Sequence, residues 1–445
     1  MIEHPLLQVV RPGRIFARRD GRSIPVETFL GDVAALSRRL PSGGHVVNLC
    51  RDRYRFAVGF AAALCRRQVN LLPPNDMPGM LDQLAMDYPD VYCLTDAAQP
   101  DGPAIFPYPS SLPHDPAERL VPRIPADHLA AVLFTSGSTG RPQPHGRSWG
   151  DLVNSTLSAG RRLGICSLQG ASLIGTVPHQ HSYGLESLPM LALQHELVLH
   201  TGRPFYPADI IAELAAAPCP RVLVTTPLHL QVLLAEPATM PSVDLVLSAT
   251  APLSVPLARE AEQRFAGTLF EIYGCSEAGQ IAVRRTALTQ EWCRLDGIML
   301  RQDSIGTWAS GVPIAEETLL SDVIELHDHA RFSLHGRIAD LVNVAGKRTS
   351  LAHLNHHLNA IDGVLDGAFV ASDDDGSAVS RLIAFAVAPG MSAEGIMASL
   401  RLRIDAAFLP RPLRLVAALP RNALGKLPRR DVMRLLAESR AVDEA

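Results

Sequence analysis

A short segment rich in glycine and hydroxyl groups offers the clearest chemistry in the chain. It follows a predicted buried strand, residues 129–135, and consists of Thr135, Ser136, Gly137, Ser138, Thr139, Gly140 and Arg141. Glycine lets the backbone fold tightly enough for successive N–H groups to face one anion, and the hydroxyl groups and the arginine add donors. This combination is typical of phosphate binding, although a plain polar turn has a similar composition. The G-K-[ST] ending of a Walker A loop is absent, which argues against a conventional P-loop kinase.

Lysine is almost missing from the chain, so the two that remain are candidates for specific roles. Of 41 basic residues, only Lys347 and Lys426 are lysines. Arginine can replace lysine where a general positive charge is enough, but its planar guanidinium is a poor substitute for a compact ammonium group. Chance survival of both lysines is the alternative.

Composition and charge restrict the class of protein. The chain has 445 residues, of which 47% are apolar and 19% charged, and its formal net charge is −4. These values predict a soluble globular protein of two or three domains, with no electrostatic reason to bind nucleic acid or an anionic membrane. No apolar run approaches the roughly 20 residues of a membrane span, and the first residues do not resemble a secretory signal. The dispersed cysteines indicate reduced thiols. We therefore expect a cytoplasmic protein with no membrane span.

Short apolar runs alternate with amphipathic segments through most of the chain. Strands are predicted at 45–50, 129–135, 221–226, 243–249 and 268–273, and helices at 26–40, 56–67, 207–217 and 256–265. Such alternation predicts an α/β fold with a largely parallel sheet. Residues 98–125, rich in proline, aspartate and serine, are predicted to form a long surface loop.

The pattern of the sequence changes after residue 337. Short strands are predicted at 338–344, 366–371 and 382–387, with helices at 351–360, 392–407 and 429–440. We therefore expect residues 1–337 to form a large N-terminal α/β body with several subdomains. Residues 338–445 would form a smaller, mobile α+β C-terminal domain.

Six segments occur in the order found in one enzyme family. They are TSGSTGRP (135–142), SATAPLS (248–254), YGCSEAG (273–279), SDVIEL (321–326), GRIADLVNVAGKR (336–348) and LPRNALGKLPRR (419–430). They strongly resemble the adenylate-forming superfamily of acyl- and aryl-CoA synthetases, peptide-synthetase adenylation domains and luciferases, and the resemblance covers about residues 15–435. The resemblance implies a two-step reaction. A carboxylate attacks the α-phosphate of ATP to give an acyl-adenylate and pyrophosphate, and a thiol then displaces AMP.

The resemblance also implies roles for individual residues. The loop 135–141 would hold the β- and γ-phosphates, and Lys426 would bridge the attacking carboxylate and the α-phosphate. Asp322 and Arg337 would contact the ribose. The other nucleotide contacts would come from Thr250, Ala251, Tyr273, Gly274 and Ser276, with Tyr273 along the adenine. Glu277 would bind Mg²⁺, a hard cation that prefers oxygen ligands. The expected cofactors are therefore ATP and Mg²⁺.

The segment VPHQHSYGLE (177–186) stands where this family lines its acyl pocket. The pocket residues would be Pro178, His181, Tyr183, Gly184, Ala249 and Gly274. His181 would pack beside the substrate carboxylate, which makes it a catalytic candidate together with Lys426 and Glu277. No acidic residue takes the position at which peptide-synthetase domains pair with an α-ammonium group, although Glu186 is close. This absence argues against an α-amino acid substrate.

Two groups of histidines invite a metal-site interpretation, and neither has a convincing pattern. His179 and His181 lack an evident third ligand. His353, His356 and His357 would share one face of a helix, where a solvated surface is the simpler explanation.

Three departures from the family pattern are visible. The lysine that often follows the phosphate loop is replaced by Gln143, so Arg141 or Arg147 would have to supply the charge. Ala339 stands where a hinge acid or lysine is usual, with Asp340 next to it. The short spacing between Glu277 and Asp322 indicates that the large body has lost a subdomain segment.

The substrate and the thiol acceptor are the least determined features. The short chain and the His-containing pocket resemble stand-alone ligases of bacterial aryl-polyene or xanthomonadin-type pigment pathways. That likeness implies a small aromatic carboxylic acid, such as 3- or 4-hydroxybenzoate, loaded onto the phosphopantetheine of an acyl carrier protein. An arginine excess in the small domain would suit an acidic carrier. Its members are Arg401, Arg403, Arg411, Arg414, Arg421, Arg429 and Arg430. A ligase that uses coenzyme A is the alternative, and a non-catalytic nucleotide- or acyl-binding module is an alternative of another class.

Overall fold

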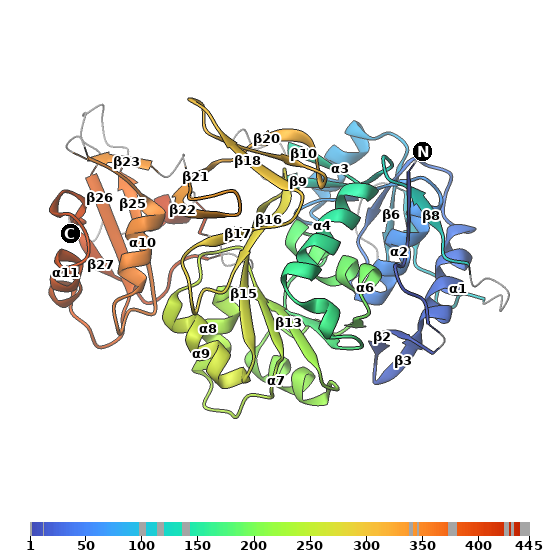
Figure 1. Ribbon diagram of the computed structural model, residues 1–445, viewed down its shortest axis with the longest axis horizontal. Helices are drawn as coiled ribbons and strands as arrows, with labels where there is room; N and C mark the ends of the chain where they lie inside the picture. The colour runs from blue at the N-terminus through green and yellow to red at the C-terminus, as the bar shows by residue number, and fades with distance from the viewer. Residues whose placement is uncertain are drawn as a thin grey trace.

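The computed structural model shows a large N-terminal body joined to a smaller C-terminal domain, which lies at the left of Figure 1. The described residues are 2–11, 13–97, 104–113, 120–135, 143–337, 341–344, 347–372, 381–421, 427–428 and 431–436. Within these residues, no helix combines the length and the apolarity that a membrane crossing requires. The mixed helix and sheet architecture confirms the predicted α/β class.

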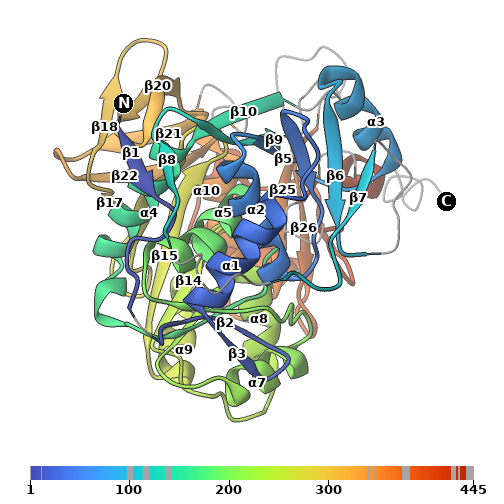
Figure 2. The same ribbon diagram turned by 90° about the vertical axis from the view of Figure 1, so that its right-hand side faces the viewer.

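One layer of the body is a six-stranded sheet in which only the β10 edge runs antiparallel to its neighbour. The strand order is β10-β9-β5-β4-β6-β7. The strands are β4 (His45–Asn48), β5 (Val69–Leu72), β6 (Val91–Thr95), β7 (Ile105–Pro107), β9 (Leu129–Thr135) and β10 (Gln143–Ser148). The helices of this part of the chain are α1 (Val26–Ser37), α2 (Arg53–Cys65), α3 (Pro78–Asp87) and α4 (Trp149–Arg162). In Figure 2, α3 lies to the right of β6, whereas α1 and α2 lie at the front, near the centre of the molecule.

A second sheet of eleven strands carries the parallel segment that matters for the site. Its order is β21-β22-β17-β16-β15-β14-β13-β11-β12-β2-β3, with parallel pairing from β15 through β2. The parallel strands are β2 (Ile15–Arg19), β11 (Ser172–Gly175), β12 (Val198–His200), β13 (Arg221–Thr225), β14 (Leu245–Ser248) and β15 (Thr268–Cys275). The antiparallel additions are β3 (Arg22–Pro25), β16 (Gly279–Arg284), β17 (Trp292–Arg294), β21 (Asp322–Leu326) and β22 (Arg331–Arg337).

Further short elements complete the body. They are β1 (Glu3–Pro5), β8 (Arg123–Pro125), η1 (Ile165–Ser167), α5 (Ser182–Leu185), the π-helix η2 (Glu186–Met190), α6 (Leu191–Gln194), α7 (Pro207–Ala216), α8 (Pro227–Ala235), α9 (Val255–Phe265), β18 (Ile298–Gln302), β19 (Thr307–Gly311) and β20 (Ile314–Leu319). β1 pairs with β8, and β18, β19 and β20 form a small antiparallel sheet.

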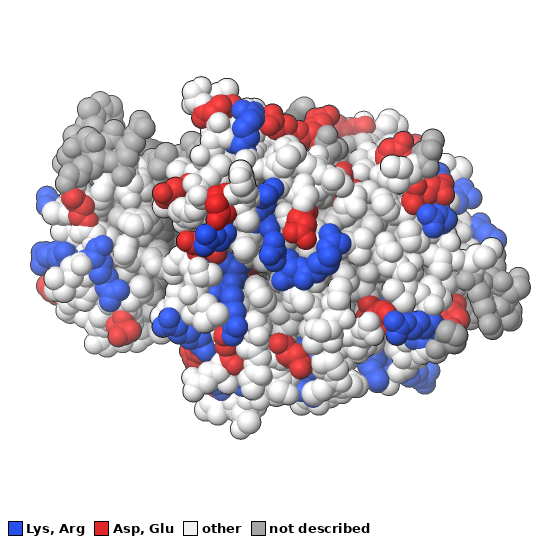
Figure 3. All heavy atoms as spheres, viewed as in Figure 1, with Lys and Arg blue, Asp and Glu red and all other residues white. Residues whose placement is uncertain are grey.

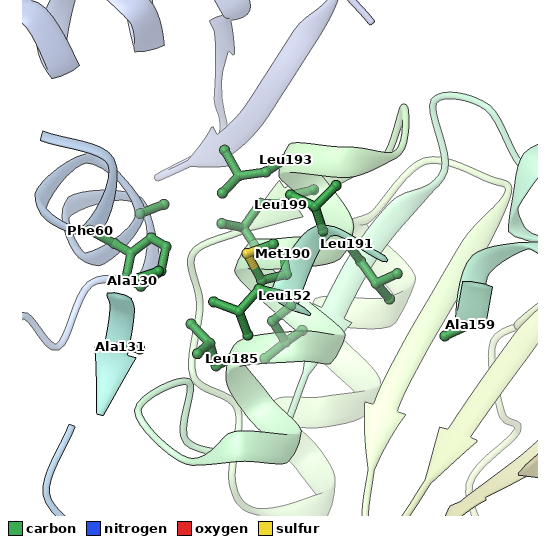
Figure 4. Packing of buried hydrophobic residues seen from close by; sticks show 14 of the residues in the cluster. Phe60, Ala130, Ala131, Leu152, Ala159, Leu185, Met190, Leu191, Leu193 and Leu199 are labelled. Carbon is green, nitrogen blue, oxygen red and sulfur yellow. The ribbon is translucent and has the colours of Figure 1, made fainter. Parts of the chain in front are cut away.

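Alternation along the strands divides the apolar side chains between two cores. Val222 and Val224 of β13 face the core shared with α2 and α4, whereas Leu223 faces the core formed with α7, α8 and α9. Successive strand residues point to opposite faces, so a continuous apolar run predicts a strand buried on both sides. Figure 4 shows the first core, where Leu152 of α4 lies near Leu185 and Met190.

The helices begin where the sequence supplies caps. The Asp52 side chain accepts a hydrogen bond from the backbone N–H of Arg55 at 2.9 Å, which fixes the start of α2. Ser148 and Asp151 form a reciprocal capping box at the start of α4. Such caps satisfy N–H groups that have no partner within the helix.

The C-terminal domain has its own sheets and its own core. A hairpin of β23 (Leu341–Val344) and β24 (Lys347–Ser350) leads into α10 (Leu351–Asn359). A three-stranded sheet follows, made of β25 (Asp366–Ser372), β26 (Arg381–Val387) and β27 (Leu413–Leu415), with α11 (Ala393–Arg401) and the short η4 (Ala406–Phe408). Residues 431–436 are helical.

Contacts tie the two parts together at β22 and at α8 of the body. The Ser350 hydroxyl donates to the carbonyl of His335, and the Gln231 amide on α8 donates to the carbonyl of Leu365. The placement of the domain boundary between 337 and 338 remains a prediction.

Most predicted elements occur within a few residues of their expected bounds, but two predictions need correction. Residues 98–125 are not simply a loop, because β7 and β8 lie within them and pair with β6 and β1. The helix expected at 392–407 is α11 alone, since the chain turns at Leu402 before the short η4.

Candidate active site

The predicted site residues follow the carboxyl ends of neighbouring parallel strands. The segment 177–184 follows β11, residues 249–251 follow β14, and residues 273–277 lie at the end of β15 and in the turn after it. Because parallel strands end at the same edge, these segments converge there, as ligand-binding loops of open α/β sheets do. The structure therefore brings the predicted acyl-pocket and nucleotide segments together.

Tyr183 fixes the predicted acyl-pocket segment to the strands beside it. Its hydroxyl group lies 2.9 Å from the carbonyl oxygen of Leu247 and 3.1 Å from that of Thr225, and it donates to this pair of acceptors. These carbonyl groups belong to β14 and β13. Tyr183 is thus an anchor of the segment as well as a lining candidate.

The short helix α5 requires glycine at position 184. A Cβ atom there would lie 1.9 Å from the carbonyl oxygen of Pro178, a distance that no side chain tolerates. This close approach folds the segment back on itself and places the half-buried His181 at the start of α5.

His179 is buried beneath the same segment and does not resemble a metal ligand. Its Nε2 donates to the carbonyl of Cys50 at 2.9 Å, and its ring packs 4.4 Å from that of Phe56. Burial, together with the nearby Arg53 guanidinium, lowers the pKa of His179 to about 3, so the ring is neutral at physiological pH. Arg53 donates to the carbonyl groups of Gly175 and Val177 and holds the start of the segment.

The β15–β16 hairpin presents the next group of predicted residues. The Tyr273 ring is 7% exposed and packs between Trp292 and Phe332, at centroid distances of 5.6 and 5.8 Å. Its hydroxyl group donates to Oδ2 of Asp322 at 2.8 Å. The predicted adenine and ribose residues are therefore directly linked.

Asp322 and Arg337 are also neighbours across the sheet. They are register partners at the ends of β21 and β22. The side chain of Arg337 lies outside the described groups, so its predicted contact with the ribose rests on the position of its backbone.

Glu277 lies in the hairpin turn with its carboxylate partly exposed, and Ser276 beside it is half-buried. Oε1 of Glu277 is 3.8 Å from Nε2 of His145 on β10. The described residues contain no group of three or more His, Cys, Asp or Glu side chains arranged to hold a metal ion. A single accessible carboxylate still fits Mg²⁺ that is bound mainly by substrate phosphates and water.

Cys275, next to Glu277, is an inert thiol in this setting. Burial first, and then the neighbouring Glu277 carboxylate, raises the pKa of Cys275 to about 12. A thiol with that pKa carries almost no thiolate near neutral pH, so Cys275 is a poor candidate for a nucleophile.

Thr250 has a strained backbone in the predicted nucleotide loop. Its φ is +82°, in the left-handed region that β-branched residues rarely adopt. Strain of this kind is common at functional sites. Ala249 before it is buried, and Ala251 after it is half-buried.

Arg147 and Glu186 form a buried pair that the sequence does not reveal. Arg147 is 2% exposed and Glu186 is 1% exposed, with 3.9 Å between Nη1 and Oε1. The expectation that Arg147 could supply charge to the phosphates is not supported, because its guanidinium is turned toward Glu186. Glu186 also accepts hydrogen bonds from the hydroxyl groups of Ser155 and Ser182, so it is already engaged within the body.

Several predicted residues lie outside the described parts of the chain. They are Ser136, Gly137, Ser138, Thr139, Gly140, Arg141, Ala339, Asp340, Lys426, Arg429 and Arg430, together with the side chains of Thr135 and Lys347. Their roles remain predictions.

The three histidines of α10 lie at the junction with the body. The ring centroids of His353 and His357 are 4.6 Å apart, and those of His356 and His357 are 5.6 Å apart. Burial lowers the pKa of each.

Comparisons with known proteins agree with this geometry. The sequence model of the family described as AMP-binding enzyme matches residues 73–314. A 4-coumarate–CoA ligase of Rhodobacter capsulatus is 30% identical over 303 residues, which cover 66% of this chain and 74% of that protein. A 4-coumarate–CoA ligase of Halorhodospira halophila is 28% identical over 319 residues, covering 68% and 76%.

Solved structures with the same fold match almost the whole chain. ATP-bound MatB from Rhodopseudomonas palustris has a TM-score of 0.82 at 18% identity and covers 97% of both chains. The o-succinylbenzoate CoA synthetase of Bacillus subtilis, in complex with ATP and magnesium, has a TM-score of 0.81 at 17% identity and covers 96% of this chain and 99% of its own. At such low identity the likeness establishes the fold.

Proposed function

Because this chain belongs to the AMP-binding, adenylate-forming enzyme family and is an acid–thiol ligase, we propose that it adenylates an aromatic carboxylic acid and transfers the acyl group to a phosphopantetheine thiol. The observation that carries the proposal is the convergence of three segments at one sheet edge. Residues 177–184 would receive the acid, residues 249–251 would pass the adenine, and residues 273–277 would reach both.

Different residues at this sheet edge would position different parts of the two substrates. Asp322, held by the Tyr273 hydroxyl, would accept hydrogen bonds from the ribose, and loop 135–141 would hold the phosphates. Lys426 would place its ammonium group between the carboxylate and the α-phosphate, which reduces the repulsion between two anions. Glu277 would hold Mg²⁺, which would neutralise charge on the phosphates when bound. Holding both reactants in line removes most of the entropic cost of their encounter.

An aromatic acid, such as 3- or 4-hydroxybenzoate, is the proposed substrate. Two relatives carry the name 4-coumarate–CoA ligase, and 4-coumarate is a hydroxylated aromatic acid. No acidic side chain stands free in the predicted pocket segment to pair with an α-ammonium group, since Glu186 is buried against Arg147, Ser155 and Ser182. This supports an acid without an amino group.

An acyl carrier protein is the proposed thiol donor, with coenzyme A as the second candidate. Arg401, Arg403 and Arg411 are exposed on the small domain and would suit an acidic carrier. Arg421 does not belong to this surface, because it forms two 2.7 Å hydrogen bonds with Asp366. On the face in Figure 3, the small domain at the left carries separate basic and acidic side chains, whereas a run of basic side chains lies near the centre of the view. The names of the curated relatives favour coenzyme A.

The decisive experiment measures pyrophosphate release with ATP and Mg²⁺ over a panel of hydroxybenzoates, cinnamates, fatty acids and amino acids. We expect release with aryl acids, and Lys426→Ala should remove most of it while leaving thioester formation from a synthetic acyl-adenylate. Lys347→Ala, at the only other lysine, is the matched control and should retain release. Equal loss of both half-reactions in Lys426→Ala would contradict the assigned role.

Adding a thiol then identifies the acceptor. Thioester formed on a holo carrier protein but not on coenzyme A would support the proposal, and the reverse result would establish the coenzyme A ligase. Nucleotide binding without release for any acid would indicate a non-catalytic binding module.

A further inference from the structure

A buried polar cluster lies beside the β15–β16 hairpin, within an otherwise apolar core. Arg147 reaches it from β10, Ser155 from α4, Ser182 from the start of α5 and Glu186 from the start of η2. Glu186 accepts from Ser155 at 2.7 Å and from Ser182 at 3.3 Å. Arg147 donates through Nη2 to the carbonyl of Pro313 at 3.4 Å.

Gln280 extends this cluster from the hairpin side. It is 6% exposed, and its Nε2 donates to the hydroxyl oxygen of Ser187 at 3.3 Å. Ser187 follows Glu186 directly, and Gln280 follows Gly279. A Cβ atom on Gly279 would lie 2.1 Å from Nη1 of Arg147, so the guanidinium lies against the backbone next to Gln280.

Two polar atoms of the cluster have no hydrogen-bond partner among the described residues. They are Nη1 of Arg147, a donor, and Oε1 of Gln280, an acceptor. The Glu186 carboxylate is 3.9 Å from Nη1, which is beyond hydrogen-bond distance. Buried polar groups are usually paired, and an unpaired one costs about 1–3 kcal/mol. Each of these two atoms therefore has unused hydrogen-bonding capacity.

The position of Gln280 links this capacity to the predicted pocket. Gln280 is the register partner of Gly274, and a Cβ atom at Gly274 would lie only 3.0 Å from the Cα of Gln280. Ser182 of the cluster precedes Tyr183, the pocket anchor. The cluster therefore adjoins both segments that would enclose the acid.

We propose that Arg147 and Gln280 determine substrate specificity by binding a hydroxyl group on the ring of the aromatic acid, a proposal that rests on the proposed function. A phenolic hydroxyl can accept one hydrogen bond and donate another, which matches one free donor and one free acceptor. Turning the Gln280 amide over exchanges its free acceptor for a free donor, and a hydroxyl group satisfies either arrangement. A second carboxylate fits poorly, because Glu186 already opposes the charge of Arg147.

The first test uses the unmodified enzyme and compares kcat/KM for 4-hydroxybenzoate, 3-hydroxybenzoate, benzoate, 4-methylbenzoate and terephthalate in pyrophosphate release. One of the hydroxybenzoates should exceed benzoate and 4-methylbenzoate by about 10- to 100-fold in kcat/KM, because the acids without a ring hydroxyl leave both polar atoms unpaired. Terephthalate should be poor. Equal use of benzoate and both hydroxybenzoates would overturn the proposal while leaving the adenylation of aryl acids intact. No release with any aryl acid would instead contradict the proposed function.

The second test replaces Gln280 by methionine, which has a similar length and lacks the amide. Gln280→Met should reduce the preference for the hydroxylated acid over benzoate by about 10-fold or more. Gln194→Met is the matched control, because Gln194 is 2% exposed, donates to the carbonyl of Leu6 and also has an Oε1 atom without a partner. The control should keep the wild-type preference. An unchanged preference in Gln280→Met, or the same loss in both variants, would overturn the proposal.

Discussion

The hydrogen bond between Tyr273 and Asp322 makes a prediction that separates a binding role from a structural one. Replacing Tyr273 by phenylalanine removes the hydroxyl group that donates to Oδ2 of Asp322 at 2.8 Å. The ring contacts with Trp292 and Phe332 do not involve that oxygen and should persist. The substitution therefore tests one hydrogen bond.

The expected magnitude follows from the charge of the acceptor. A hydrogen bond to a charged group contributes about 1.5–3 kcal/mol when its surroundings are buried. Asp322 is partly exposed, so we expect the free energy of unfolding to fall by about 1–2 kcal/mol. If Tyr273 holds Asp322 in place for the ribose, the KM for ATP should rise by about tenfold, which corresponds to about 1.4 kcal/mol. The KM for the acid should change little.

Urea unfolding and the ATP dependence of pyrophosphate release measure the two effects. Tyr92→Phe is the matched control, because the Tyr92 hydroxyl is buried and donates to Oε1 of Gln68 at 2.8 Å, away from the site edge. The control should lose a similar amount of stability and keep its KM for ATP. Loss of stability in both variants with no change in the KM of Tyr273→Phe would refute the positioning role.

Two further predictions concern a buried histidine and a strained loop. Burial holds the pKa of His179 at about 3, whereas the pKa of a histidine in the unfolded chain is about 6.5. As the pH falls from about 6.5 to about 3, the unfolded chain therefore binds the proton first, and the folded state loses stability. In His179→Gln the amide can still donate to Cys50, but the titrating ring is gone. Between about pH 6 and 4, the unfolding free energy from urea titrations should therefore fall less steeply than in the wild type, by up to about 1.4 kcal/mol per pH unit. An unchanged slope would contradict the buried neutral state of His179. Thr250→Gly should raise the free energy of unfolding by about 0.5–1 kcal/mol through relief of strain at φ +82°. It should also raise the KM for ATP, and a loss of stability on denaturation would show that the Thr250 side chain contributes more than its backbone strain costs.

The local hydrophobicity pattern predicts the parallel strands well, because these strands are buried on both faces and consist of consecutive apolar residues. The apolar run 129–135 coincides with β9, and 221–226 differs from β13 by one residue. β7 and β8 were missed for the opposite reason. Each is a three-residue strand whose pairing partner, β6 or β1, is supplied by another part of the chain. Nothing within residues 98–125 encodes that partner.

The same distinction applies to the site: residues within motifs could be predicted from the sequence, whereas contacts between distant segments could not. Tyr273, Asp322 and Tyr183 were identified from the motifs that contain them, and the structure brings their segments to one edge. The bond between Tyr273 and Asp322 could not be inferred from spacing, because it depends on how β21 pairs beyond β22. Arg147 was considered for the phosphates because the lysine that often follows the phosphate loop is replaced by Gln143. Its burial against Glu186 is set by the packing of β10, η2 and β16.

An unpaired buried atom does not by itself indicate a ligand, because Oε1 of Gln194 and Oδ1 of Asn70 share that state in other parts of the body. What distinguishes Gln280 is its place. It faces Gly274 across the hairpin that carries Tyr273 and Glu277, and its neighbour Gly279 touches the Arg147 guanidinium. A buried ion pair such as Arg147 and Glu186 often contributes no more to stability than apolar residues of the same volume. The fold could therefore do without this polar cluster, whereas recognition of a ring hydroxyl could not.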